Sequence, residues 1–134
     1  MHPVFKDRVW ELAIEPPWRA TDCEYCIEIT QPEGVGALHI MSARKMKGMI
    51  TPAETKERMT AECPNGTDIE KIRCGDFAGH TGEYVDWNTS AYWKKWLLAY
   101  QNDLLFATYT CPRGEEELGV YQVAKLLTTL RSKT

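Results

Sequence analysis

The sequence predicts an α+β fold in which an antiparallel sheet of about six or seven strands is covered by two helices. Short apolar segments with two-residue periodicity recur along the chain, and turn residues separate them. A capped helix is predicted near residues 52–62 and an amphipathic helix near 115–131. The 134 residues are the usual length of one domain, so we expect a single domain over 1–134.

The first third of the chain predicts short strands and a hairpin. Residues 8–14 (RVWELAI) form a candidate strand that ends at two prolines, because proline cannot donate to a sheet ladder. Polar and apolar side chains then alternate over 22–30 (DCEYCIEIT), which is typical of one half-buried strand. A turn rich in proline and glycine over 32–36 joins it to a partner strand over 37–43 (ALHIMSA).

The clearest local signal is the start of the first helix. Thr51 is a good N-cap, Pro52 suits the first helical position, and Glu54 completes a capping box. The helix is expected to end near Glu62, because the sequence CPNG over 63–66 stops and turns the chain.

From residue 69 to residue 111 the sequence predicts an antiparallel meander. Its segments are IEKIRCGDFAG, GEYVDW, YWKKWLLAY and DLLFATYTC, divided by short turns at 79–82, 88–90 and 101–103. YWKKWLLAY is apolar on both sides toward its end, which predicts a central strand covered on both faces.

The last predicted element is a helix that covers the sheet. It begins after the sequence PRG at 112–114, with three glutamates in a first turn where the helix dipole favours negative charge. A buried stripe with helical spacing is formed by Val120, Val123, Ala124, Leu127 and Leu130.

Composition and charge exclude several classes of function. The net charge of −3 and the pI of about 5.6 argue against general binding of nucleic acid or anionic membranes, which needs a basic face. The start, MHPVFKDRVWEL, lacks the apolar segment of a secretory signal, and the longest apolar runs are far shorter than the roughly 20 residues of a membrane span. We therefore expect a cytoplasmic protein, and its five cysteines fit reduced thiols better than a disulfide framework.

Cys23 and Cys26 have the spacing of a metal-binding or redox pair. In one strand over 22–30, however, side chains three positions apart project from opposite faces of the sheet. A zinc site would also need two further ligands, and the sequence offers no second pair of cysteines or histidines. We therefore expect the pair to be inert, and we expect neither a metal nor a cofactor.

The segment 74–87 (CGDFAGHTGEYVDW) collects more polar and aromatic groups than any other. One interpretation is a functional rim, in which His80 forms an acid–base pair with Asp76 or Asp86 and Cys74 serves as a nucleophile. The other is a packed hairpin whose glycines form the bend. GHTG is not a phosphate-binding loop, because it lacks the lysine and the following helix.

Five aromatic residues follow closely on one another between residues 84 and 96, and most are expected in the core. Trp93 lies beside two lysines, where an exposed ring would suit partner recognition, and nearby carboxylates would offer an acidic rim to a basic partner. The predicted binding residues are Asp76, His80, Glu83, Tyr84, Asp86, Trp87 and Trp93.

The second half of the chain carries patterns that resemble a known fold. These are Gly75-Asp-Phe-Ala-Gly79, Tyr84, Trp96-Leu-Leu98 and Leu104-Leu-Phe-Ala-Thr-Tyr109. Together with the order of elements, they are similar to small bacterial proteins of the PsbP-like fold, which photosystem PsbP proteins and the nuclear-import factor Mog share. The resemblance implies a binding or accessory protein more than a catalyst, and it assigns no functional residue.

Three functions follow as hypotheses. The first is a non-catalytic protein-binding module, specifically an immunity or adaptor protein that masks a partner such as a toxin. It would use the 76–93 region or the open face of the sheet. The second is a small enzyme or ligand-binding protein with a pocket around Asp76, His80 and Cys74. The third is a self-associating structural subunit.

Overall fold

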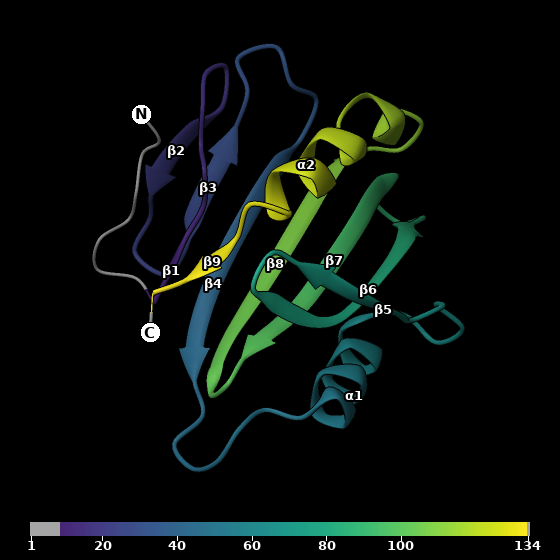
Figure 1. Cartoon of the computed structure of the whole chain (residues 1–134). Coiled ribbons are helices and arrows are strands. Elements are labelled where there is room, and N and C mark those ends of the chain that lie inside the picture. Colours follow the sequence, from purple (N-terminus) through teal and green to yellow (C-terminus); the bar gives the residue numbers. More distant parts are fainter. Residues whose placement is uncertain (1–8, 134) are drawn as a thin grey trace.

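The computed structural model describes residues 9–133, and within them seven strands form one antiparallel sheet in the order β2-β3-β4-β8-β7-β6-β5 (Figure 1). A separate antiparallel pair joins β1 to β9. The strands are β1 (Trp10–Glu11), β2 (Arg19–Asp22), β3 (Ile27–Thr30), β4 (Ala37–Arg44), β5 (Glu70–Cys74), β6 (Phe77–Asp86), β7 (Ala91–Tyr100), β8 (Asp103–Pro112) and β9 (Arg131–Ser132). The helices are α1 (Pro52–Glu62), the 3₁₀ turn η1 (Glu116–Leu118) and α2 (Val120–Leu127). The predicted α+β class is confirmed.

The two helices lie on opposite faces of the sheet. Neighbouring residues of a strand point to opposite faces, and Leu97 and Leu98 of β7 belong to two separate cores. Leu98 faces the larger core, which α2 closes with Val123 and Leu127 (Figure 1). Leu97 faces a smaller core closed by α1 through Met59. The larger core thus holds the sheet together, and α1 covers only part of the other face.

Strand β7 is the covered central strand that its sequence predicts. It pairs with β6 on one side and with β8 on the other. Trp96 and Leu98 are fully buried in the larger core, and Leu97 is buried on the other face. Burying one such side chain stabilises the fold by about 1.5–3 kcal/mol.

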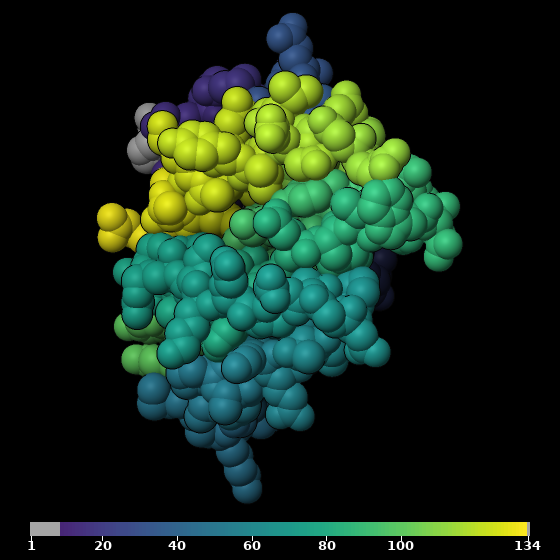
Figure 2. Space-filling model, turned by 90° about the vertical axis from the view of Figure 1, so that its right-hand side faces the viewer, coloured from purple at the N-terminus to yellow at the C-terminus, as the bar shows by residue number. Residues whose placement is uncertain are grey.

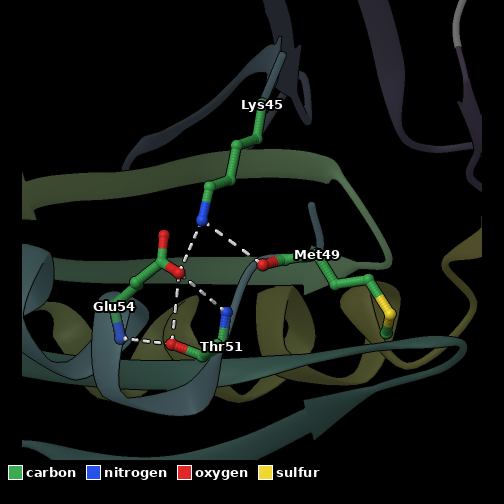
Figure 3. Close-up of polar contacts among 4 residues, drawn as sticks. All are labelled: Lys45, Met49, Thr51 and Glu54. Carbon is green, nitrogen blue, oxygen red and sulfur yellow. Dashed lines mark hydrogen bonds and ion pairs between the residues drawn. The ribbon is translucent and has the colours of Figure 1, made fainter. Parts of the chain in front are cut away.

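A network of short polar contacts determines where α1 begins (Figure 3). The backbone N–H of Glu54 donates to Oγ1 of Thr51 at 3.2 Å, and the carboxylate of Glu54 accepts from the backbone N–H of Thr51 at 3.4 Å. Nζ of Lys45 lies 2.7 Å from the same carboxylate. The capping box is therefore confirmed, and an ion pair ties it to the end of β4.

The structure differs from the sequence prediction at two turns. Residues 22–30 form not one strand but the end of β2, a tight turn at Glu24-Tyr25 and the whole of β3. The predicted turn at 79–82 lies instead at Gly75-Asp76, so that β6 runs straight through 79–82. The turns at 88–90 and 101–103 are close to their predicted places.

The terminal elements are also shorter than predicted. The strand predicted over 8–14 is reduced to β1, and its first residue lies outside the described part of the chain. The helix predicted over 115–131 is split into η1 and α2 by Gly119. The hydroxyl groups of Thr128 and Thr129 donate to carbonyls three residues back, at 2.6 and 2.7 Å, which ends the helix and releases β9.

Candidate functional site

The candidate site lies where β6 continues past its neighbour. The pairing of β5 with β6 ends at Glu70 and Thr81, whereas β6 extends to Asp86. Its segment 82–86 pairs with β7 on one side and borders a groove of about 520 Å³ on the other. We call this the β6 groove. Residues 64–68 and Glu70 line one wall, and residues 81–85, Trp87 and Lys94 line the other. Figure 2 shows this edge of the molecule, where teal residues separate the blue residues of α1 from the yellow C-terminal residues.

The β6 groove carries an acidic lining. Asp68, Glu70 and Glu83 contribute carboxylates, and Lys94 is the cation among the lining residues. Glu83 is oriented by the hydroxyl group of Tyr92, which donates a hydrogen bond to its carboxylate. Burial raises the pKa of Tyr92, and the bond to Glu83 raises it further, so this hydroxyl stays a donor at neutral pH.

Trp87 is the exposed aromatic residue at the end of the groove. Its side chain is 70% exposed, and the guanidinium carbon of Arg113 lies 4.8 Å from its ring centroid. This cation–π contact holds the ring at the surface. Next to it, the carboxylate of Asp86 accepts a hydrogen bond of 3.0 Å from the backbone N–H of Asn88, which closes the turn to β7.

Trp93 does not serve as the exposed ring that its lysine neighbours predict. It lies opposite Tyr84 across β6 and β7, and Nζ of Lys95 lies 5.4 and 5.3 Å from the two ring centroids. The same ammonium group donates to the carbonyl of Glu62 at 3.0 Å, at the negative end of α1. Trp93 is therefore half-buried, and Lys95 links its ring to the end of α1.

The structure does not bring Asp76, His80 and Cys74 together. Cys74 faces the larger core, where burial raises its pKa to about 11, so it is a poor nucleophile. His80 lies on the face covered by α1, with Nδ1 2.8 Å from Oγ1 of Thr55. The carboxylate of Asp76 accepts a bond of 2.9 Å from the backbone N–H of Ser132 and so anchors β9.

The two cysteines of the CxxC sequence do not project from opposite faces of one strand, because they lie on the two sides of a hairpin. Cys23 and Cys26 are the next pair after Asp22 and Ile27 in the β2–β3 hairpin, and the N–H of Cys23 donates to the carbonyl of Cys26 at 2.8 Å. Both are thiols in the structure. Directly paired residues have Cα atoms about 5.5 Å apart, within the range of a disulfide, so the predicted separation of the pair is wrong.

Sequence reasoning missed one wall of the groove and one polar pair. The sequence CPNG at 63–66 indicates a turn, but nothing local indicates that the turn lies against β6. Thr55 likewise meets His80 only through the packing of α1 on the sheet.

Within residues 9–133, no three side chains of His, Cys, Asp or Glu gather in a group that could hold a metal ion. In the same range, no helix is long and apolar enough to span a membrane.

Comparisons with known proteins identify the fold. No protein-family model matches, and no curated protein matches either. A protein from Bacteroides thetaiotaomicron VPI-5482 is similar in structure, with a TM-score of 0.67 and 12% sequence identity. The match covers 94% of this chain but only 46% of that protein. Cyanobacterial PsbP (CyanoP) from Synechocystis sp. PCC 6803 is similar with a TM-score of 0.62 and 9% identity, over 97% of this chain and 90% of the other. The chain therefore has a PsbP-like fold, as the resemblance in sequence implied.

Proposed function

We propose that this chain is a non-catalytic protein-binding module that takes up an extended, basic segment of a partner protein in the β6 groove. The observation that carries the proposal is the free edge of residues 82–86, which borders an acidic groove. An edge strand presents unpaired backbone N–H and C=O groups on its open side, and an extended peptide can add to it as a further strand.

The lining of the groove specifies the chemistry of that segment. Carboxylates at Asp68, Glu70 and Glu83 favour lysine or arginine side chains. In an added strand, alternate side chains point to the same face, so the basic residues would recur at every second position. The ring of Trp87 at the end of the groove offers a flat apolar contact to the stem of a long basic side chain.

A peptide-display experiment tests the proposal. A library of random dodecapeptides is selected on the wild-type protein, and the selected peptides are tested on the double variant Asp68→Lys and Glu70→Lys. Both side chains are exposed, so the variant keeps the fold. We expect basic peptides, binding that weakens at least about tenfold in the variant, and slower hydrogen exchange at amides 82–86.

The matched control reverses two exposed carboxylates elsewhere, Glu24→Lys and Glu57→Lys, and so produces the same change of net charge. Binding to the control should stay close to that of the wild type. The proposal fails if the selected peptides bind the groove variant as tightly as the control, or if exchange at residues 82–86 is unchanged.

The finer form of the proposal is a cytoplasmic immunity or adaptor protein that masks its partner. A partner strand added to β6 would be buried along its length, which is how such a protein covers a functional segment. The neighbouring gene discriminates this form from others. An adjacent gene for a secreted toxin with a basic exposed strand supports it, and a metabolic operon contradicts it.

A further inference from the structure

A second hollow lies on the same strand as the β6 groove but on the face covered by α1. It has a volume of about 450 Å³, in the range of small-molecule sites. Ile50 and Pro52 at the start of α1 form one wall, and Ala78 and Ala99 of the sheet form the floor. His80 also lines it, so we call it the His80 hollow.

The hydrogen bonds of His80 leave one ring nitrogen for a bound molecule. The imidazole is 3% exposed, and its Nδ1 lies 2.8 Å from Oγ1 of Thr55. The hydroxyl group of Thr55 donates to the carbonyl of Pro52 at 3.0 Å, so its oxygen accepts from Nδ1–H. This network assigns the proton to Nδ1 and leaves Nε2 as a hydrogen-bond acceptor, which an N–H or O–H group of a ligand can reach.

The charges around the hollow are positive. Lys71 pairs with His80 across β5 and β6, and Arg73 pairs with Ala78, which places both cations on the face of the hollow. The lining residues include no carboxylate. Desolvation lowers the pKa of His80, and the charges of Lys56 and Lys71 lower it further, as a positive field would.

We propose that the His80 hollow binds a small organic acid, whose carboxylate contacts the cations of Lys71 and Arg73. The apolar part of the acid packs against Ile50, Pro52 and Ala99. Apolar walls with a few convergent polar groups are the usual composition of a small-molecule site. This site is separate from the β6 groove, because it lies at the other end of β6 and the two sets of lining residues have no member in common.

A pair of isosteric probes tests the proposal, namely 4-phenylbutyrate and its neutral amide. Binding is measured by titration, with the amide resonances of Thr55, Ala78 and Ala99 as the structural readout. We expect the acid to bind at least about tenfold more tightly than the amide, because only the acid can pair with the cations. Equal affinities, or no binding of the acid at millimolar concentration, overturn the proposal.

Two variants locate the binding. Lys71→Met with Arg73→Met removes the cations from exposed positions and should weaken the acid about tenfold while leaving the amide unchanged. Ala78→Phe fills the half-buried floor and should abolish binding of both probes. Lys94→Met is the control, since it lines the β6 groove instead. Unchanged binding of the acid to either test variant overturns the proposal, as does equal weakening by the control.

Discussion

Arg44 and Asp103 form an ion pair in which Nε lies 2.8 Å from Oδ1, and the pair joins the end of β4 to the start of β8. The side chain of Asp103 is 1% exposed and that of Arg44 is 51% exposed. Removing the arginine therefore leaves a buried carboxylate without this partner. Such a loss is more costly than losing an ordinary surface ion pair.

We predict that Arg44→Gln lowers the free energy of unfolding by roughly 1–3 kcal/mol, measured by urea denaturation. Arg58→Gln on the exposed side of α1 is the control and should change it by less than about 0.5 kcal/mol. Equal midpoints for the two variants would show that Asp103 does not depend on Arg44.

The capping box of α1 predicts a dependence on pH. The hydrogen bond from Lys45 lowers the pKa of Glu54 below its ordinary value of 4.5. A lowered pKa in the folded state gives stability that is present above the unfolded value and is lost as the pH falls through the folded value. The wild type should therefore be more stable than Glu54→Gln at pH 7, and this difference should shrink below pH 4.5. Thermal unfolding at the two pH values measures it. Glu57→Gln is the control, and a difference that stays constant with pH contradicts the prediction.

The thiols should differ in reactivity. Cys23 is exposed, whereas Cys74 is buried with its pKa raised to about 11. Because the thiolate is the reactive form, iodoacetamide at pH 8 should label Cys23 first and Cys74 last. Peptide mass spectrometry measures the order, and urea should make the rates similar. Rapid labelling of Cys74 in the folded protein would restore its interpretation as a nucleophile.

Gly75, in the turn between β5 and β6, should not tolerate replacement by a residue with a side chain. Gly75 has φ of +63°, and a Cβ there would lie 1.9 Å from the carbonyl oxygen of Leu130. Gly114 has φ of +93° and open space around it, so Gly114→Ala measures the cost of a positive φ without a steric clash. Gly75→Ala should therefore destabilise the protein by roughly 1–3 kcal/mol more than Gly114→Ala. Equal losses in denaturant titrations would mean that the C-terminal segment moves aside without cost.

Elements with local determinants were predicted well. The start of α1 depends on contacts among Thr51, Pro52 and Glu54, all within one turn, and the helix runs over the predicted residues. Strand β7 shows apolar residues on both sides because it is covered on both faces, and that pattern is visible in the sequence. The PsbP-like order of elements follows from such local signals.

The two turns that the sequence predicts wrongly lie where the local signals are absent or misleading. Glu24-Tyr25 forms a tight turn without glycine, proline or asparagine, so nothing interrupts the alternating pattern. Gly79 resembles a turn residue, but it lies inside β6, where the backbone of Leu97 approaches it closely. A Cβ at this position would lie 1.9 Å from the carbonyl oxygen of Leu97. For the candidate site, the sequence indicated Glu83, Tyr84 and Trp87. The contact of Thr55 with His80 depends on tertiary packing, which residue spacing does not reveal.

The strand order divides the sheet into two halves made by separate parts of the chain. Strands β2, β3 and β4 come from one part and β5 to β8 from the other, and within this sheet they meet along one seam of paired residues from Ala37–Thr110 to Arg44–Asp103. The pairing of β1 with β9 joins the same two parts outside the sheet. The connection between them runs outside the sheet, from β4 through the loop at 45–49 to α1 and then to β5 (Figure 1). A cut between Lys47 and Gly48 interrupts no strand, so two co-expressed fragments should reassemble along this seam. Fragments that stay apart in size-exclusion chromatography would show that the seam needs the covalent connection.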